Sequence, residues 1–222
     1  MDSQRLIEGA ILLIPLVLSL TVHEFAHAWS AWLLGDDTAQ REGRMTLDPM
    51  PHIDPIGTLL LPFMSIAFSS PIPLGWARPV PINPARFRRG VDMSTGMMIT
   101  ALAGPFSNVL LALLSAAAYG MTLRWAPDTL AANPGLKTFL LSVAGMNVAL
   151  ALFNLLPIPP LDGSRVVERF VPYSMRDTWE RVVQLSPFLL LAFLYFGRGL
   201  LVGPIGYFTG LLDGLIFSIW LG

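Results

Sequence analysis

Long apolar segments constrain the fold of this chain more than any other feature. Residues 9–34, 93–125 and 136–156 are long apolar stretches, and residues 185–222 hold enough apolar sequence for two more short helices. A helix that spans a bilayer needs about 20 such residues. Charged residues make up 13% of the sequence, against roughly 25% in soluble domains. The pattern predicts an all-α polytopic membrane protein with about five to six transmembrane helices.

The chain is expected to form one membrane-embedded domain over residues 1–222. Residues 6–170 would make a three-helix core, and residues 185–222 a C-terminal helical pair. Residues 56–68 are apolar but number only 13, and stretches of 10–14 are typical of re-entrant or interfacial segments. We therefore expect a short re-entrant segment there. The Pro-rich residues 71–90 are expected to form a small extended hairpin.

Two of the chain's three histidines stand four residues apart, in the run His23-Glu24-Phe25-Ala26-His27 inside the first apolar segment. Residues at that spacing share one face of a helix. Two imidazoles can then hold one zinc ion, with Glu24 beside them as general base. The alternative is a set of polar residues packed in a bundle, but ionisable residues inside a membrane segment are costly and usually functional. The run therefore predicts a metal site.

A catalytic zinc takes three protein ligands and a water, so a third ligand must come from elsewhere. The chain has no cysteine, which leaves His52 or a carboxylate. His52 lies in a polar loop, where a solvated histidine is the more ordinary interpretation. Asp162 follows an apolar helix and three prolines that break it, so the backbone could turn this carboxylate toward the first helix. Asp162 could also cap a helix over residues 164–170, which does not exclude metal binding.

Two motifs together resemble the site-2 protease family of intramembrane zinc metalloproteases. They are His-Glu-x-x-His in a membrane helix and Asn-x-x-Pro-x-x-x-Leu-Asp-Gly, which occupies residues 154–163. The Ala103-Gly104-Pro105 turn with Asn108 is similar to a further family feature, and so are the runs at residues 43–49 and 75–81. The resemblance covers most of residues 9–170.

The resemblance implies a role for five residues. His23, His27 and Asp162 match the family's zinc ligands. Glu24 matches its catalytic glutamate, and Asn154 matches an asparagine that assists near the scissile carbonyl. From the residues alone, Asn154 could equally make a helix-end hydrogen bond.

These roles predict a zinc endopeptidase that cuts peptide bonds within or next to transmembrane segments, with a transmembrane protein or peptide as substrate and the lipid bilayer as surroundings. A zinc-binding transporter or sensor is the first alternative, although the apolar helices supply few further ligands. Another membrane zinc enzyme with a glutamate ligand, such as Glu168 or Glu180, and an inactive relative are the others. A formal net charge of −1 without a Lys/Arg block gives no case for nucleic acid.

The metal site also constrains the topology. If residues 56–68 crossed the membrane, Asp162 would emerge at the face opposite His27, yet zinc ligands each lie about 2 Å from the metal. If residues 56–68 dip in and return, Asp162 emerges on the His27 side. Ten of the 14 Lys and Arg residues then share that side, and the positive-inside rule makes it cytoplasmic. We expect a protein of the cell (inner) membrane with its site toward the cytoplasm.

The hairpin at residues 71–90 has two interpretations. Pro79 and Pro81 lack N–H groups, so in an extended strand the edge that carries Arg78, Val80 and Ile82 stays able to pair. That edge could hold an unwound substrate segment by strand addition. An ordinary structural hairpin or interfacial loop is the alternative.

Overall fold

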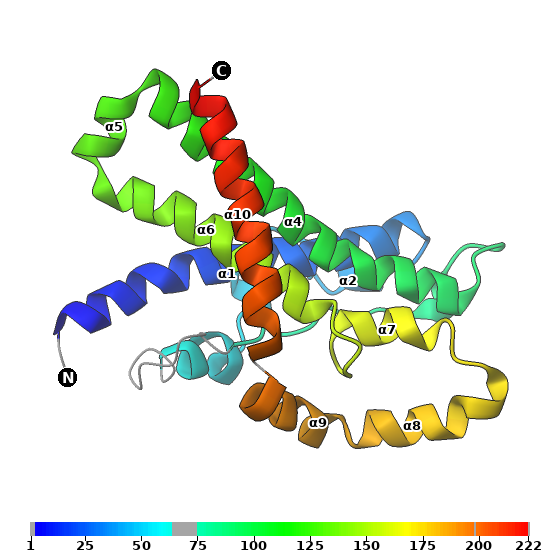
Figure 1. Cartoon of the computed structure of the whole chain (residues 1–222). Helices are drawn as coiled ribbons and strands as arrows, with labels where there is room; N and C mark the ends of the chain where they lie inside the picture. The colour runs from blue at the N-terminus through cyan, green and yellow to red at the C-terminus, as the bar shows by residue number, and fades with distance from the viewer. Residues whose placement is uncertain (1–2, 64–74, 198, 222) are drawn as a thin grey trace.

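Four helices of the described residues are long and apolar enough to cross a membrane. The computed structural model describes residues 3–63, 75–197 and 199–221, and within them the chain is helical without a β-strand. The four helices are α1 (Ser3–Leu33), α4 (Met93–Trp125), α6 (Pro134–Asn154) and α10 (Gly199–Leu221) (Figure 1). A bent pair at residues 173–184 and 186–197 would make a fifth.

The described residues hold four spans, or five if the bent pair counts as one, against the expectation of about five to six. The C-terminal apolar run forms two helices: α9 (Ser186–Ala192), with a one-turn extension at Phe193–Gly197, and the long helix α10. The extended α9 segment is bent by 63° from the helical segment before it, residues 173–184. The three earlier long helices lie where the sequence predicts them.

Helix α4 is the centre of the bundle and packs against α1, α6 and α10. It begins where the Asp92 side chain accepts a hydrogen bond from Thr95 N, an ordinary N-cap. The short helix α5 (Pro127–Ala132) links α4 to α6, so these two helices run antiparallel (Figure 1). At the far end of α4, the Arg124 guanidinium donates to Ile219 O of α10. Helix α10 therefore runs parallel to α4.

The connection from α1 to α4 is held at the α1 end by buried polar contacts. Helix α1 ends at Leu33, and the chain turns at Gly35, whose φ of 108° favours glycine. The next residue, Asp36, is buried and accepts hydrogen bonds from Thr38 N and Asn83 N. Arg88 N donates to Leu34 O. The C-terminal end of α1 therefore lies beside the start of α4.

Between these contacts the chain forms short helices: α2 (Thr38–Arg41), η1 (Met50–His52), the π-helical turn η2 (Pro55–Leu60) and η3 (Pro84–Arg86). Residues 61–63 continue η2 as helix, and residues 64–74 lie outside the described part. The expected re-entrant segment and hairpin both fall partly in that gap. Among the described residues, 75–83 are irregular and form no hairpin ladder.

After α6 the chain returns along the same end of the bundle. It forms α7 (Asp162–Glu168), a short turn η4 (Tyr173–Met175) and α8 (Arg176–Gln184) before α9. Helix α7 packs against α4. The first residue of α7, Asp162, lies beside His23 and His27 of α1.

Candidate metal centre

Helix α1 presents three buried ionisable side chains in two turns. His23, Glu24 and His27 are each less than 10% exposed. The two imidazoles lie edge to face with their centroids 4.6 Å apart, and their Nε2 atoms are 3.0 Å apart. The expected sharing of one helix face is therefore confirmed.

Asp162 joins this pair from a position 135 residues later than His27. Its Oδ2 lies 3.2 Å from His23 Nε2, and its Oδ1 lies 3.4 Å from His27 Nε2. An aspartate side chain is ordinarily ionised at neutral pH, because its usual pKa is about 3.9. The ionised form is the one that binds metals.

The local sequence explains how Asp162 reaches the pair. After α6 the chain turns back so tightly that a Cβ on Gly163 would collide with the carbonyl oxygen of Leu155. Glycine is therefore required beside the aspartate. Asp162 is the first residue of α7, and Leu161 holds the N-cap position. The alternative role of Asp162 as the cap of a helix over residues 164–170 is wrong, because the helix already begins at Asp162.

Each imidazole is held from behind by its Nδ1 atom. His27 Nδ1–H donates to Thr100 O at 2.7 Å, and His23 Nδ1–H donates to Asn108 Oδ1 at 2.5 Å. Between these two α4 residues lies Gly104, where an added Cβ would come within 2.6 Å of both rings. The absent side chain of Gly104 is what lets α4 approach the histidines.

Glu24 is held by the segment that precedes α4. Val80 N donates to Glu24 Oε2 at 2.9 Å. Arg78 N donates to His52 O at 2.9 Å. Two of the three N–H groups proposed to be free for strand addition are therefore already used within the protein. The edge formed by Arg78 and Val80 is a structural contact in this conformation.

The residues present fit a zinc ion. A tetrahedral metal with ligand atoms about 2.0–2.2 Å away sets those atoms about 3.3–3.6 Å apart. The observed separations between the three side chains are 3.0, 3.2 and 3.4 Å, and one ligand atom from each lies within 4.8 Å of the others. Two Nδ1–H groups that point away leave both Nε2 lone pairs facing inward, and neutral lone pairs at 3.0 Å repel unless a cation lies between them. Nitrogen and oxygen donors are the kinds that zinc binds.

The other predicted residues lie outside this group. His52 is not the solvated loop histidine expected, because it is 2% exposed and its Nε2 bonds to Thr46 O. It serves as packing for the loop. The Asn154 amide donates to Leu150 O in its own helix, which is the helix-end hydrogen bond that was its alternative role. A part for Asn154 near a scissile carbonyl remains a prediction.

Sequence reasoning missed four contacts of the site. Thr100 and Val80 act through backbone atoms, which leave no trace in side-chain chemistry. Asn147 and Ser19 extend the hydrogen bonds behind His23. A signal for these two does exist, since a buried amide or hydroxyl in an apolar helix is costly without a partner.

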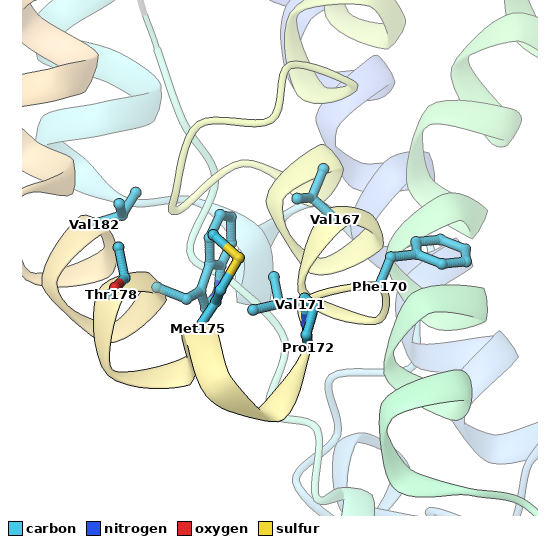
Figure 2. Close-up of a pocket in the computed structure, with 8 residues that line it drawn as sticks. Val167, Phe170, Val171, Pro172, Met175, Thr178 and Val182 are labelled. Carbon is cyan, nitrogen blue, oxygen red and sulfur yellow. The ribbon is translucent and has the colours of Figure 1, made fainter.

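An apolar groove of about 350 Å³ lies between α7 and α8, away from the metal-binding group. Figure 2 shows Val167 entering it from α7 and Thr178 and Val182 from α8. The lining residues are Val167, Phe170, Val171, Pro172, Met175, Thr178, Trp179 and Val182. None of them carries chemistry for catalysis.

Comparison with known proteins places the chain in a family. Residues 120–196 match Peptidase family M50. The chain is 39% identical over 204 residues to "Putative zinc metalloprotease YwhC" of Bacillus subtilis, covering 89% of this chain and 83% of that protein. No solved structure matches it.

Two mycobacterial proteins are also similar. Both are named "Putative zinc metalloprotease Rip2". The one from Mycolicibacterium smegmatis is 31% identical over 153 residues, covering 68% of this chain and 54% of the relative. The one from Mycobacterium tuberculosis is 33% identical over 184 residues, covering 80% and 62%. With the apolar helices and the zinc-compatible donor set, these matches establish that the chain is an integral membrane metalloendopeptidase that uses zinc and belongs to peptidase family M50, the site-2 protease family.

Proposed function

We propose that this protein is an intramembrane zinc endopeptidase in which His23, His27 and Asp162 bind the metal and Glu24 is the general base. The observation that carries the proposal is the meeting of three donor side chains whose ligand atoms lie 3.0–3.4 Å apart, close to the spacing of a tetrahedral zinc site. Two of these side chains belong to a membrane-spanning helix.

The depth of the donor group supports cleavage inside the membrane. His27 lies six residues and His23 ten residues before the end of α1 at Leu33, which corresponds to about 9 and 15 Å along the helix. Two α4 residues beside these rings, Thr100 and Gly104, lie seven and eleven residues after the start of that helix at Met93. A peptide bond cut at this depth belongs to a transmembrane segment or to the residues next to one.

Two hydrogen bonds bear on whether the chain crosses the membrane between residues 58 and 76, a stretch of which residues 64–74 lie outside the described part. Trp76 N donates to Gly57 O at 3.1 Å, and Thr58 Oγ1 donates to Trp76 O at 2.8 Å. Residues 57, 58 and 76 therefore lie at one depth, which supports the re-entrant interpretation, whereas a single crossing between them would separate them by about 30 Å. With this path, ten of the 14 Lys and Arg residues lie on the side of the metal group, so we place that side in the cytoplasm and the protein in the cell membrane.

The chemistry follows from the positions of the side chains. Zinc, when bound, supplies a water of lowered pKa and polarises the scissile carbonyl. Glu24 accepts the proton of the attacking water and returns it to the leaving nitrogen. The hydrogen bond from Val80 N keeps one Glu24 oxygen fixed, so the other oxygen is the one that accepts the proton. Asn154 would assist at the carbonyl only after releasing Leu150 O.

Cleavage of a transmembrane peptide in proteoliposomes tests the proposal. Glu24→Gln keeps an oxygen that can accept from Val80 N but cannot take a proton. Zinc content should stay at the wild-type level, while cleavage falls by about 10²–10⁴-fold, the usual worth of a general base. Glu42→Gln is the matched control, because Glu42 is exposed on the loop after α2, and it should cleave normally.

Unchanged cleavage by Glu24→Gln would remove that residue from its role. A wild-type protein that binds zinc and cuts no peptide would instead favour the transporter or sensor alternative.

A further inference from the structure

A chain of uncharged polar side chains crosses the apolar bundle behind His23. Asn108 on α4 accepts from His23 Nδ1–H and donates from Nδ2 to Asn147 Oδ1 on α6, at 2.6 Å. Asn147 Nδ2 donates to Ser19 Oγ on α1 at 2.7 Å. Asn108 and Asn147 have no exposed surface, and Ser19 has 1%. This chain of hydrogen bonds therefore joins α1, α4 and α6.

Two backbone carbonyls anchor the far end of this chain. Ser19 Oγ–H donates to Pro15 O at 2.7 Å, and Asn147 Nδ2 also donates to Val143 O at 2.8 Å. A carbonyl oxygen can only accept. These two contacts therefore identify which end of the Asn147 side chain is the NH₂ group.

The direction of every later hydrogen bond follows from that anchor. Because Asn147 turns its NH₂ toward Ser19 and Val143, its oxygen faces Asn108 and must receive an N–H. Asn108 therefore turns its own NH₂ to Asn147 and its oxygen to His23. That oxygen requires a proton on His23 Nδ1, which leaves Nε2 free to bind a metal.

We infer that Asn108 and Asn147 are positioning residues, which fix the orientation and tautomer of His23 through a hydrogen-bond chain anchored on α1 and α6. The inference rests on the proposed function, since it concerns a proposed zinc ligand. His27 needs no such chain because its Nδ1–H meets a backbone carbonyl directly. The site thus secures one ligand by backbone and the other by two amides.

A purely structural role is the competing account, because polar side chains also hold membrane helices together. The protein contains a matched example of that role. Ser115 Oγ on α4 donates to Leu140 O on α6 at 2.8 Å, so it joins the same two helices without touching a histidine. Ser115→Ala therefore measures the effect of losing a helix-to-helix hydrogen bond alone.

Zinc affinity and the visible spectrum of the Co²⁺-substituted protein distinguish the two roles in purified full-length variants. Asn108→Leu should weaken zinc binding by about 10–100-fold, as loss of such supporting contacts does, and should alter the Co²⁺ spectrum. Asn108→Asp keeps an acceptor for His23 Nδ1–H and should retain zinc within about threefold, since a carboxylate commonly fills this place. Asn147→Leu should act in the same direction as Asn108→Leu but less, because the freed Asn108 amide can still rotate.

Ser115→Ala should bind zinc as the wild type does. If Asn108 only packs, leucine will suit the apolar interior and keep the wild-type affinity and spectrum, while aspartate will do worse, and that order overturns the inference. An equal loss in Ser115→Ala overturns it too. If Asn108→Leu does not fold, the zinc affinities of Asn147→Leu and Asn108→Asp are each compared with that of Ser115→Ala. This comparison decides between the positioning role and the structural role in the same way. A wild-type protein without zinc would contradict the proposed function instead.

Discussion

Replacing Gly104 by alanine puts one methyl group against the metal-binding group. The added Cβ would lie 2.5 Å from His27 ring atoms and 2.6 Å from a His23 ring atom, about 0.9 Å short of the 3.4 Å at which ordinary contact begins. Neither ring can swing away freely, because each Nδ1–H is bonded to α4 itself. Ligand distances in a metal site stay within about 0.2 Å of their standard values.

The displacement is therefore several times this variation in ligand distance. We expect zinc affinity to fall by about 100-fold or more, which is roughly 2.7 kcal/mol. Helix propensity alone predicts the opposite sign, because alanine in place of glycine stabilises a helix interior by about 0.5–1 kcal/mol.

Competition with a chromophoric chelator measures this affinity in detergent. Gly145→Ala is the matched control, because Gly145 lies in α6 and no atom lies within 4 Å of an added Cβ there. It should leave zinc affinity unchanged. Wild-type zinc affinity in a folded Gly104→Ala protein would refute the account of how α4 holds the histidines.

Two further predictions concern the loops. The chain has no cysteine, so single cysteines at Glu42 and Ala132, both exposed, should react with membrane-impermeant reagents from opposite faces, and labelling of both from one face would contradict the topology. Asp92 has a pKa below its usual value, first because Thr95 N donates to it. Since its folded pKa lies below the unfolded value of about 3.9, its stabilising contribution is present above pH 4 and is lost as pH falls through the folded pKa. The thermal midpoint of the wild type should therefore fall more between pH 5 and pH 3 than that of Asp92→Ala, and equal falls would remove Asp92 as a helix cap.

Local features made the helices predictable. Helix α4 spans the predicted residues 93–125 because Asp92 marks its start and Pro127 begins the next helix. The pairing of His23 and His27 on α1 could be predicted from the helical repeat alone. The position of Asp162 could not, since it depends on a turn that Gly163 permits.

Contacts between distant residues explain what sequence reasoning could not supply. Spacing along the chain does not reveal that Val80 N would meet Glu24, or that Asn147 would stand behind Asn108. His52 looked solvated because its neighbours are polar, yet the loop folds over it. The bend of 63° between residues 173–184 and 186–197 was not predicted, because length alone does not show where an apolar run will bend.

We propose that His23, His27 and Asp162 hold one zinc ion. Zinc X-ray absorption on the wild type and on Asp162→Ala is the decisive test of this ligand set. We expect two imidazole nitrogens and one or two oxygens at about 2.0–2.2 Å in the wild type, and loss of bound zinc in the variant. A third imidazole or a sulfur in the wild-type shell, or an unchanged zinc signal in Asp162→Ala, would contradict it.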